Sequence, residues 1–230
     1  MRPPAGRLAP VSKPNIALAV AASVLLAACG SGQAEDLSRA DIANVAEVES
    51  SFGPPFTVRT VGPAAIDPRL LGPQTLPPGL TFDPPDCAAE AARQTVPAGV
   101  KGNMAATTAE GDGVRYIVIA VETSEPVPVT TPAEHCRKVS FTGPGVRGQV
   151  DVVDAPQIDG TTTVGTHRVL QTVTPEGPRT GDLYNYVAHF GNFIVIVTAN
   201  PLVAPDKPVV PVDTERAREL VTQAVSLVKG

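Results

Sequence analysis

The side chains best suited to chemistry in this sequence are three cysteines, Cys29, Cys87 and Cys136. Cys29 stands in the stretch "LLAACGSG", at the end of an apolar run and between small residues. A thiol in such an accessible setting can serve as a nucleophile and accept a covalent group, whereas a cysteine in an apolar core is usually inert. The sequence therefore separates one candidate modification site from one further pair of cysteines.

The residues before Cys29 have the pattern of a secretory signal peptide. Arg2, Arg7 and Lys13 are the only charged side chains there, and the apolar stretch that follows ends at Ala28. That stretch is too short to cross a hydrocarbon core of about 30 Å as a helix. A basic start, a short apolar segment and small residues at a cleavage point predict that residues 1–28 are a signal peptide.

The four residues Leu26-Ala27-Ala28-Cys29 match the lipobox of bacterial lipoproteins. In that motif the thiol receives a diacylglyceryl group and the signal is cut just before the cysteine. The alternative is an ordinary signal peptide with an unrelated cysteine. Acyl chains contribute about 0.8 kcal/mol per buried methylene, and two chains anchor stably where one is marginal. We expect lipidation at Cys29, a short tether over residues 29–37, and a protein anchored on the extracytoplasmic side of the cell membrane.

Cys87 and Cys136 are predicted to form a disulfide, because disulfides persist in exported proteins and an even number of thiols remains once Cys29 is used. Closing a loop of about 50 residues stabilises the fold by about 4 kcal/mol in the loop-entropy model. Two alternatives are free thiols and a metal site, since Glu134, His135 and Cys136 are adjacent. Zinc sites usually carry a second pair of spaced ligands, which the sequence lacks. We therefore expect no metal and no cofactor.

Composition excludes some classes of partner. The formal net charge of the chain is −5, and it becomes more negative when the three signal-peptide cations are removed. A domain this acidic lacks the basic surface that nucleic acids require and carries no polybasic patch for anionic lipid headgroups. Tryptophan is absent and aromatic residues make up 4% of the chain, which disfavours stacking platforms for bases or sugars.

Periodicity predicts a single domain over residues 38–230, with helices at both ends. The first helix follows Ser38 as cap, with Asp41 at the capping-box position, and ends at Gly53. The last helix begins after Asp213 and continues to Lys229. A short helix is expected over residues 84–95. Strands are expected at 56–61, 101–109, 114–123, 139–142, 147–153, 167–173, 183–190 and 193–199. Hairpin turns at residues 110–113 and 191–192 indicate an α+β fold, an antiparallel sheet with helices packed on it.

Several short motifs resemble a family of mycobacterial lipoproteins whose domain has no known function. They are Phe82-Asp83-Pro84-Pro85-Asp86-Cys87, Cys136, Val146-Arg147-Gly148, Asp154-Ala155-Pro156, Ile158-Asp159-Gly160 and Tyr184-Asn185-Tyr186-Val187-Ala188. Together with the closing helix they cover residues 38–229. The layout more loosely resembles the extracellular sensor domains of mycobacterial serine/threonine kinases. It also resembles lipoproteins with the fold shared by the photosystem subunit P and the nuclear-import factor Mog. The resemblance implies no catalytic residue.

The sequence gives no motif for enzymatic chemistry. It contains no GxSxG, HExxH, P-loop or GxGxxG pattern, and Ser124 and Ser140 have no apparent partner base. The three histidines, His135, His167 and His189, are dispersed, and His189 beside a hairpin turn is expected at the surface or at an edge. Three carboxylates, Glu122, Asp159 and Asp182, could pair for hydrolysis, but acidic residues are numerous. We expect a protein that is not an enzyme.

The proline-rich segment over residues 62–85 is the candidate binding region. Unstructured connections of this length are uncommon and are often functional. Its apolar side chains are Leu70, Leu71, Leu76, Leu80 and Phe82. They either pack on the sheet as part of the core or line a groove for an apolar envelope molecule or a partner protein.

The sequence thus favours a membrane-anchored envelope lipoprotein with a non-enzymatic binding or accessory domain. One alternative is a hydrolase that acts on envelope material. The other is a lipoprotein that is purely structural or binds only proteins.

Overall fold

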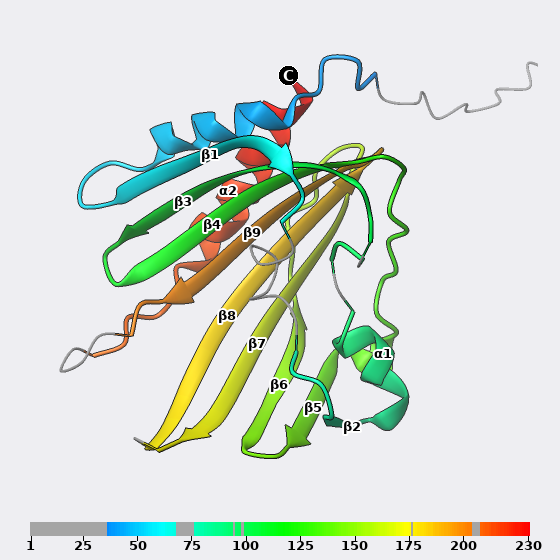
Figure 1. Cartoon of the computed structure of the whole chain (residues 1–230), viewed down its shortest axis with the longest axis vertical. Helices are drawn as coiled ribbons and strands as arrows, with labels where there is room; N and C mark the ends of the chain where they lie inside the picture. Colours follow the sequence, from blue (N-terminus) through cyan, green and yellow to red (C-terminus); the bar gives the residue numbers. More distant parts are fainter. Residues whose placement is uncertain (1–35, 68–75, 94, 98, 176, 204–207) are drawn as a thin grey trace, which may run out of the picture. The chain divides into compact units, whose positions relative to one another are not determined.

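A nine-stranded antiparallel sheet organises the part of the chain that the computed structural model describes (Figure 1). That part comprises residues 36–67, 76–93, 95–97, 99–175, 177–203 and 208–230. The strand order is β1-β3-β4-β9-β8-β7-β6-β5-β2. The strands are β1 (Thr57–Ala65), β2 (Thr81–Asp83), β3 (Gly102–Gly111), β4 (Val114–Thr123), β5 (Lys138–Gly143), β6 (Val146–Val153), β7 (Thr162–Thr174), β8 (Gly177–Phe190) and β9 (Phe193–Pro201). The predicted α+β class is confirmed.

The hairpins lie where the turn residues predict them. Asp112 and Gly113 adopt positive φ angles of 48° and 75° between β3 and β4, and Gly191 has a φ of 54° between β8 and β9. Glycine reaches this left-handed region without steric cost. Turn chemistry therefore fixes the register of these pairs, in which Gly111 lies opposite Val114 and Phe190 opposite Phe193.

The largest departures from the predicted bounds are in β1, β7 and β8, together with the unpredicted β2. β1 continues to Ala65 because a bulge between Val61 and Ala64 accommodates Pro63, which cannot donate to the ladder. β7 and β8 begin earlier and pair from Thr162 to Thr174, although their outer halves are polar and lack apolar alternation. β2 is a three-residue edge strand, paired with β5, inside the segment where no strand was predicted.

The helices are shorter than predicted, except at the C-terminus. η1 (Ile42–Ser51) is a 3₁₀ helix capped by Asp41, whose carboxylate accepts the Ala43 N–H, so Ser38 is not the cap. The helix expected at 84–95 is reduced to η3 (Pro85–Cys87) and α1 (Ala88–Ala91), since so short a helix gains little from propagation. η4 (Glu134–Cys136) is a further 3₁₀ turn. α2 (Thr214–Lys229) begins after Asp213, as predicted. Among the described residues, no helix is long and apolar enough to cross a bilayer.

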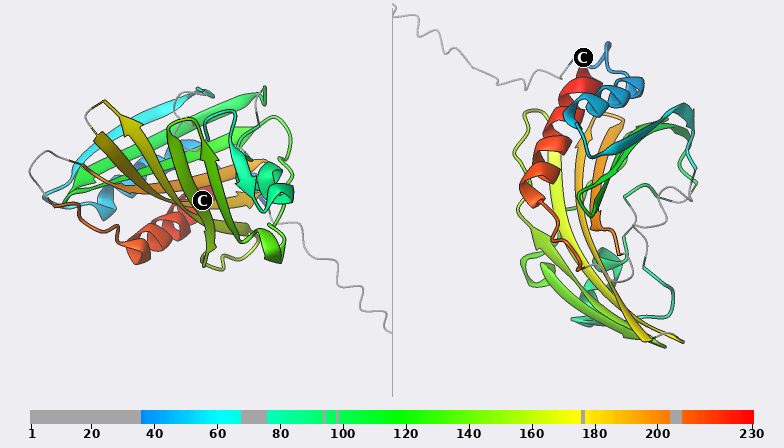
Figure 2. Two further views of the ribbon diagram at one scale, coloured as in Figure 1. Left: turned by 90° about the horizontal axis from the view of Figure 1, so that it is seen from below. Right: turned by 90° about the vertical axis from the view of Figure 1, so that its left-hand side faces the viewer.

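The main core lies between the sheet and the two long helices, which pack on one face, here called the helix face (Figure 2). Side chains from η1, α2 and the central strands β3, β4, β8 and β9 fill this layer. The Thr107 hydroxyl of β3 donates to the Val45 carbonyl at 3.1 Å, and Asn44 donates to the Leu227 carbonyl at 3.0 Å. η1 is therefore held to both the sheet and α2.

The opposite face, here called the groove face, is covered by connecting segments and by α1 rather than by a long helix (Figure 2). Two smaller apolar clusters lie there. One contains Met104, Ile119 and Ile196, with Val100 and Val127 packed against it. The other surrounds Cys87 and Cys136 at the β2 end of the sheet, with Phe82 packed against it. Between these clusters the groove face is hollowed.

Candidate functional site

Strand alternation decides which side chains reach the groove face. Successive residues of a strand point to opposite faces, so Tyr186 and Ala188 of β8 enter the main core, while Asn185, Val187 and His189 point the other way. On β7 the same period directs Thr166 and Arg168 to the groove face. Because β7 and β8 are long central strands, these side chains form a continuous floor.

The larger of the two cavities that Arg168 lines has a volume of about 340 Å³. Its floor consists of Val150, Val164, Thr166, Arg168, Asn185, Val187 and His189. Its two walls come from residues 90–93 with 95–97, and from residues 127–132. The walls contribute alanine, proline, valine and threonine side chains together with Glu90 and Arg93. Pockets of about 300 Å³ and above, apolar with a few polar groups, are typical of small-molecule sites.

A second cavity of about 300 Å³ lies next to the first. Leu76 faces Ile117, Leu170 and Leu183 across it, and Arg168 lines both cavities. We use the term groove for the two cavities together. It is a mainly apolar site with one arginine where its two halves meet.

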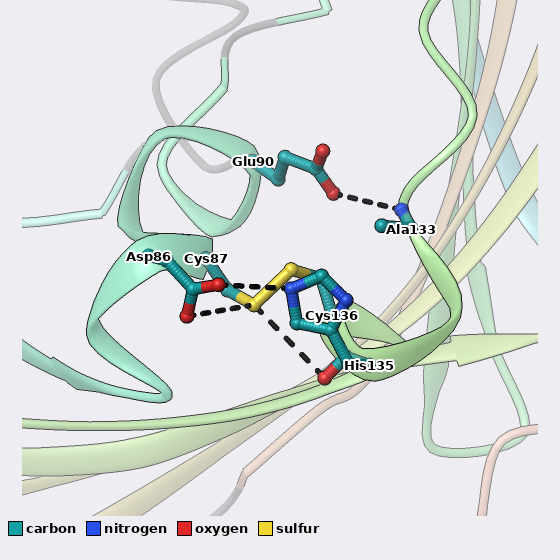
Figure 3. Close-up of a disulfide and its surroundings, with 6 residues drawn as sticks. All are labelled: Asp86, Cys87, Glu90, Ala133, His135 and Cys136. Atoms are coloured by element: carbon teal, nitrogen blue, oxygen red, sulfur yellow. Dashed lines mark hydrogen bonds and ion pairs between the residues drawn. A yellow bond between two sulfur atoms is a disulfide. The ribbon is translucent and has the colours of Figure 1, made fainter.

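The disulfide between Cys87 and Cys136 fastens the two walls together (Figure 3). Its Cα atoms are 5.4 Å apart, within the range that a disulfide requires. Glu90 accepts the Ala133 N–H at 3.2 Å, and His135 Nε2 lies 2.9 Å from an Asp86 carboxylate oxygen. Since Glu90 belongs to one wall and Ala133 follows the other, these contacts hold the walls in register.

The disulfide also bears on the alternative that Cys87 and Cys136 bind a metal ion. Ligand atoms of Cys87, His135 and Cys136 lie within 4.8 Å of one another, but the two sulfurs are bonded to each other and are not thiolates, the form that binds zinc. Glu134 lies 3.9 Å from Arg137 in an exposed ion pair. The predicted disulfide is therefore present in the structure, and this cluster does not offer the donor set of a zinc site.

Burial changes the proton affinity of two floor residues. Desolvation lowers the pKa of His189 to about 4, because the apolar surroundings disfavour the charged imidazolium. Desolvation also lowers the pKa of the Arg168 guanidinium, although arginine remains charged at neutral pH. The expectation that His189 lies at the surface or at an edge is wrong, since β8 is a central strand and His189 is half-buried in the floor.

The structure separates the residues from which a groove was predicted. Leu76 lines the second cavity, but Leu80 packs against Gly143 of β5, and the Phe82 ring lies 6.2 Å from that of Phe141. Leu70 and Leu71 lie outside the described residues, as do Cys29 and residues 1–28.

The sequence reasoning missed the two walls of the larger cavity. A signal for one of them exists, because residues 124–133 form a second proline-rich connection that carries Val127 and Val129 and leads to Cys136.

The side chains considered for hydrolysis do not gather in the groove, although Asp182 lines the second cavity. Asp182 accepts a bond from His167 Nε2 at 2.7 Å, and the His167 ring stacks on Tyr184 with centroids 4.2 Å apart. His167 and Tyr184 project from the helix face, opposite the groove. Glu122 lies in β4, while Asp159 and Ser140 are exposed elsewhere.

Comparison with known proteins identifies the family of the sequence and a solved structure with a similar fold. Residues 41–229 match the family model described as a domain of unknown function, DUF5642. An uncharacterized protein from Mycobacterium smegmatis, the Rv0999 ortholog, has an X-ray structure that is similar with a TM-score of 0.79 and 61% sequence identity. The match covers 84% of this chain and 100% of that chain. The predicted resemblance to a mycobacterial family of unknown function is confirmed.

A second solved structure, the extracellular domain of PknH from Mycobacterium tuberculosis, matches with a TM-score of 0.36 and 14% identity. The match covers 81% of this chain and 91% of that chain. At this TM-score the likeness supports no structural argument. No curated protein is significantly similar to the chain.

Proposed function

The chain belongs to the DUF5642 family, and from that premise we propose that it is a lipid-anchored binding protein of the mycobacterial cell envelope that holds an apolar molecule in its groove. The lipobox at Cys29 supports attachment to the extracytoplasmic side of the membrane. The binding role is non-enzymatic and uses no cofactor.

One observation carries this proposal: the groove face has cavities of about 340 and 300 Å³ beneath walls that a disulfide fastens together. A sheet face that only completes the core would be filled by the segments that cross it, because protein interiors are close-packed. Here the floor side chains Thr166 and Asn185 remain half-buried. Walls held by a covalent bond also reduce the ordering cost of binding.

The test compares two threonine-to-tryptophan variants of residues 36–230, a segment that contains the whole family-matched range. Thr166→Trp fills the larger cavity from its floor. Thr142→Trp adds the same ring at an exposed position of β5 and is the matched control. Each protein is titrated with N-phenyl-1-naphthylamine, whose fluorescence reports an apolar site, and apolar molecules that copurify from a mycobacterial host are extracted and identified by mass spectrometry.

We expect the wild-type segment and Thr142→Trp to bind the probe with one site, and Thr166→Trp to lose binding while far-UV circular dichroism shows the same fold. Equal binding by all three proteins would place the site elsewhere. Absence of binding by the wild-type segment, in both measurements, would refute the groove as a binding site.

A further inference from the structure

We infer that the molecule held in the groove is an acidic amphiphile, whose hydrocarbon chain lies in the larger cavity and whose anionic head contacts Arg168. This inference rests on the proposed function and adds the chemical class of the ligand. Its basis is the position of Arg168, the arginine that lines both cavities, among apolar side chains.

Arg168 occupies the centre of the groove. On β7 it lies between Val150 of β6 and Leu183 of β8, and its side chain contributes to both cavities. The side chain is half-buried. A chain that fills the larger cavity therefore ends beside a guanidinium, which presents its N–H donors in a planar fork that suits carboxylate and phosphate oxygens.

The charges around Arg168 favour an anion over a cation. Glu90 is engaged with the Ala133 backbone N–H at the wall, and Asp182 is bonded to His167 at 2.7 Å. Arg115, which lines the second cavity, forms an ion pair with Glu110 at 2.7 Å. Glu90, Asp182 and Glu110 are thus each engaged with another group, and a cationic ligand would meet the guanidinium of Arg168 and, at one wall of the larger cavity, that of Arg93.

Neutral polar groups complete the head-group position. Asn185 lies opposite Thr166 on the floor, and its amide oxygen accepts the Thr198 hydroxyl at 3.2 Å. Because that bond engages the amide oxygen, a ligand in the groove would meet the amide nitrogen, which is a donor. His189 is uncharged at neutral pH, since burial lowers its pKa to about 4, so its end of the larger cavity suits hydrocarbon. The groove therefore has a donor-rich middle and an apolar end.

The experiment compares dodecanoate, 1-dodecanol and dodecylamine by calorimetric titration of residues 36–230. A hydrogen bond to a charged group contributes about 1.5–3 kcal/mol, so dodecanoate should bind about 10- to 100-fold more tightly than dodecanol, and dodecylamine most weakly. Shortening dodecanoate to decanoate should weaken binding about 10-fold or more, because each buried methylene contributes about 0.8 kcal/mol. Arg168→Gln should reduce dodecanoate affinity to that of dodecanol and leave dodecanol unchanged.

The outcomes separate this inference from the proposed function. Equal binding of dodecanoate and dodecanol by the wild-type segment would overturn the inference but leave an apolar groove. If the wild-type segment binds none of the three, the proposed function falls with it. The wild-type comparison decides even if Arg168→Gln does not fold. Phosphatidylglycerol vesicles distinguish the source of the ligand: transfer of lipid from vesicles to the protein indicates a phospholipid, and binding of dodecanoate alone indicates a free fatty acid.

Discussion

Replacing His189 with glutamine should make the protein more resistant to acid. Burial lowers the pKa of this histidine from 6.5 to about 4, whereas an unfolded chain restores the ordinary value. Between these two pH values the unfolded state binds more protons than the folded state, so the free energy of unfolding falls as the pH decreases. The shift corresponds to about 3 kcal/mol, at about 1.36 kcal/mol per pKa unit.

The measurement is urea unfolding of residues 36–230, followed by far-UV circular dichroism at about pH 7 and about pH 4. Wild type should lose about 3 kcal/mol more stability between the two pH values than His189→Gln does. Titrating carboxylates affect both proteins alike, so the difference between the two losses isolates His189. A small domain has about 5–15 kcal/mol of stability in total, so an effect of this size is readily resolved.

His135→Gln is the matched control, because the same substitution is made at a side chain that is 61% exposed. It should keep the loss of stability on acidification that wild type owes to His189. Equal losses in wild type and His189→Gln would refute the reasoning, since they would mean that the folded groove does not disfavour the imidazolium. An NMR titration of the His189 ring with a midpoint near 6.5 would refute it independently.

Three further predictions concern the anchor, the disulfide and the helix face. Cys29→Ala should accumulate as an uncut precursor and lose lipid labelling; processing at Ala28 with continued partition into detergent would contradict the lipobox. Cys87→Ser and Cys136→Ser should each lose about 4 kcal/mol of stability. The double mutant should lose no more than either single mutant. The unreduced wild-type segment should show no free thiol when it is denatured. Arg216 lies 4.8–5.7 Å from three aromatic ring centroids and donates to the Ser51 carbonyl at 3.0 Å. Arg216→Ala should therefore lower the free energy of unfolding in urea by about 1–3 kcal/mol. Arg216→Lys should recover only part of that loss.

The sequence predicts the central strands and the last helix well because local signals agree there. β4 matches its predicted bounds, since a turn and a continuous apolar run specify it. α2 has a capping aspartate and apolar residues at helical spacing. β2 and the outer half of β8 carry no such signal, because they are strands only through pairing with β5 and β7. Their conformation is set by a neighbour and not by their own residues.

The site was less accessible to sequence reasoning because its parts are far apart in the chain. Leu76 was identified from its segment, but the wall at residues 127–132 and the floor on β7 and β8 come together only in the folded sheet. The cysteine pair was the one long-range constraint visible in the sequence, and it joins the segments that carry the two walls. The floor follows from strand parity once the register is known, and Arg168 then faces the cavities instead of solvent.

In the function proposed above, the helix face of the sheet provides most of the stability and the groove face binds the ligand. The helix face is closed by η1 and α2, which bury most of the apolar core, whereas the groove face is closed by short segments that a disulfide fastens at one end. Thr166 and Asn185, half-buried at the cavity floor, can therefore be changed without disturbing the principal packing. By contrast, substitutions of Tyr186 or Ala188, their alternating neighbours on the same sheet, act on the core. A loss of binding in Thr166→Trp with the unfolding free energy retained follows from this separation, and a parallel loss of both would show that the walls and the core fold as one unit.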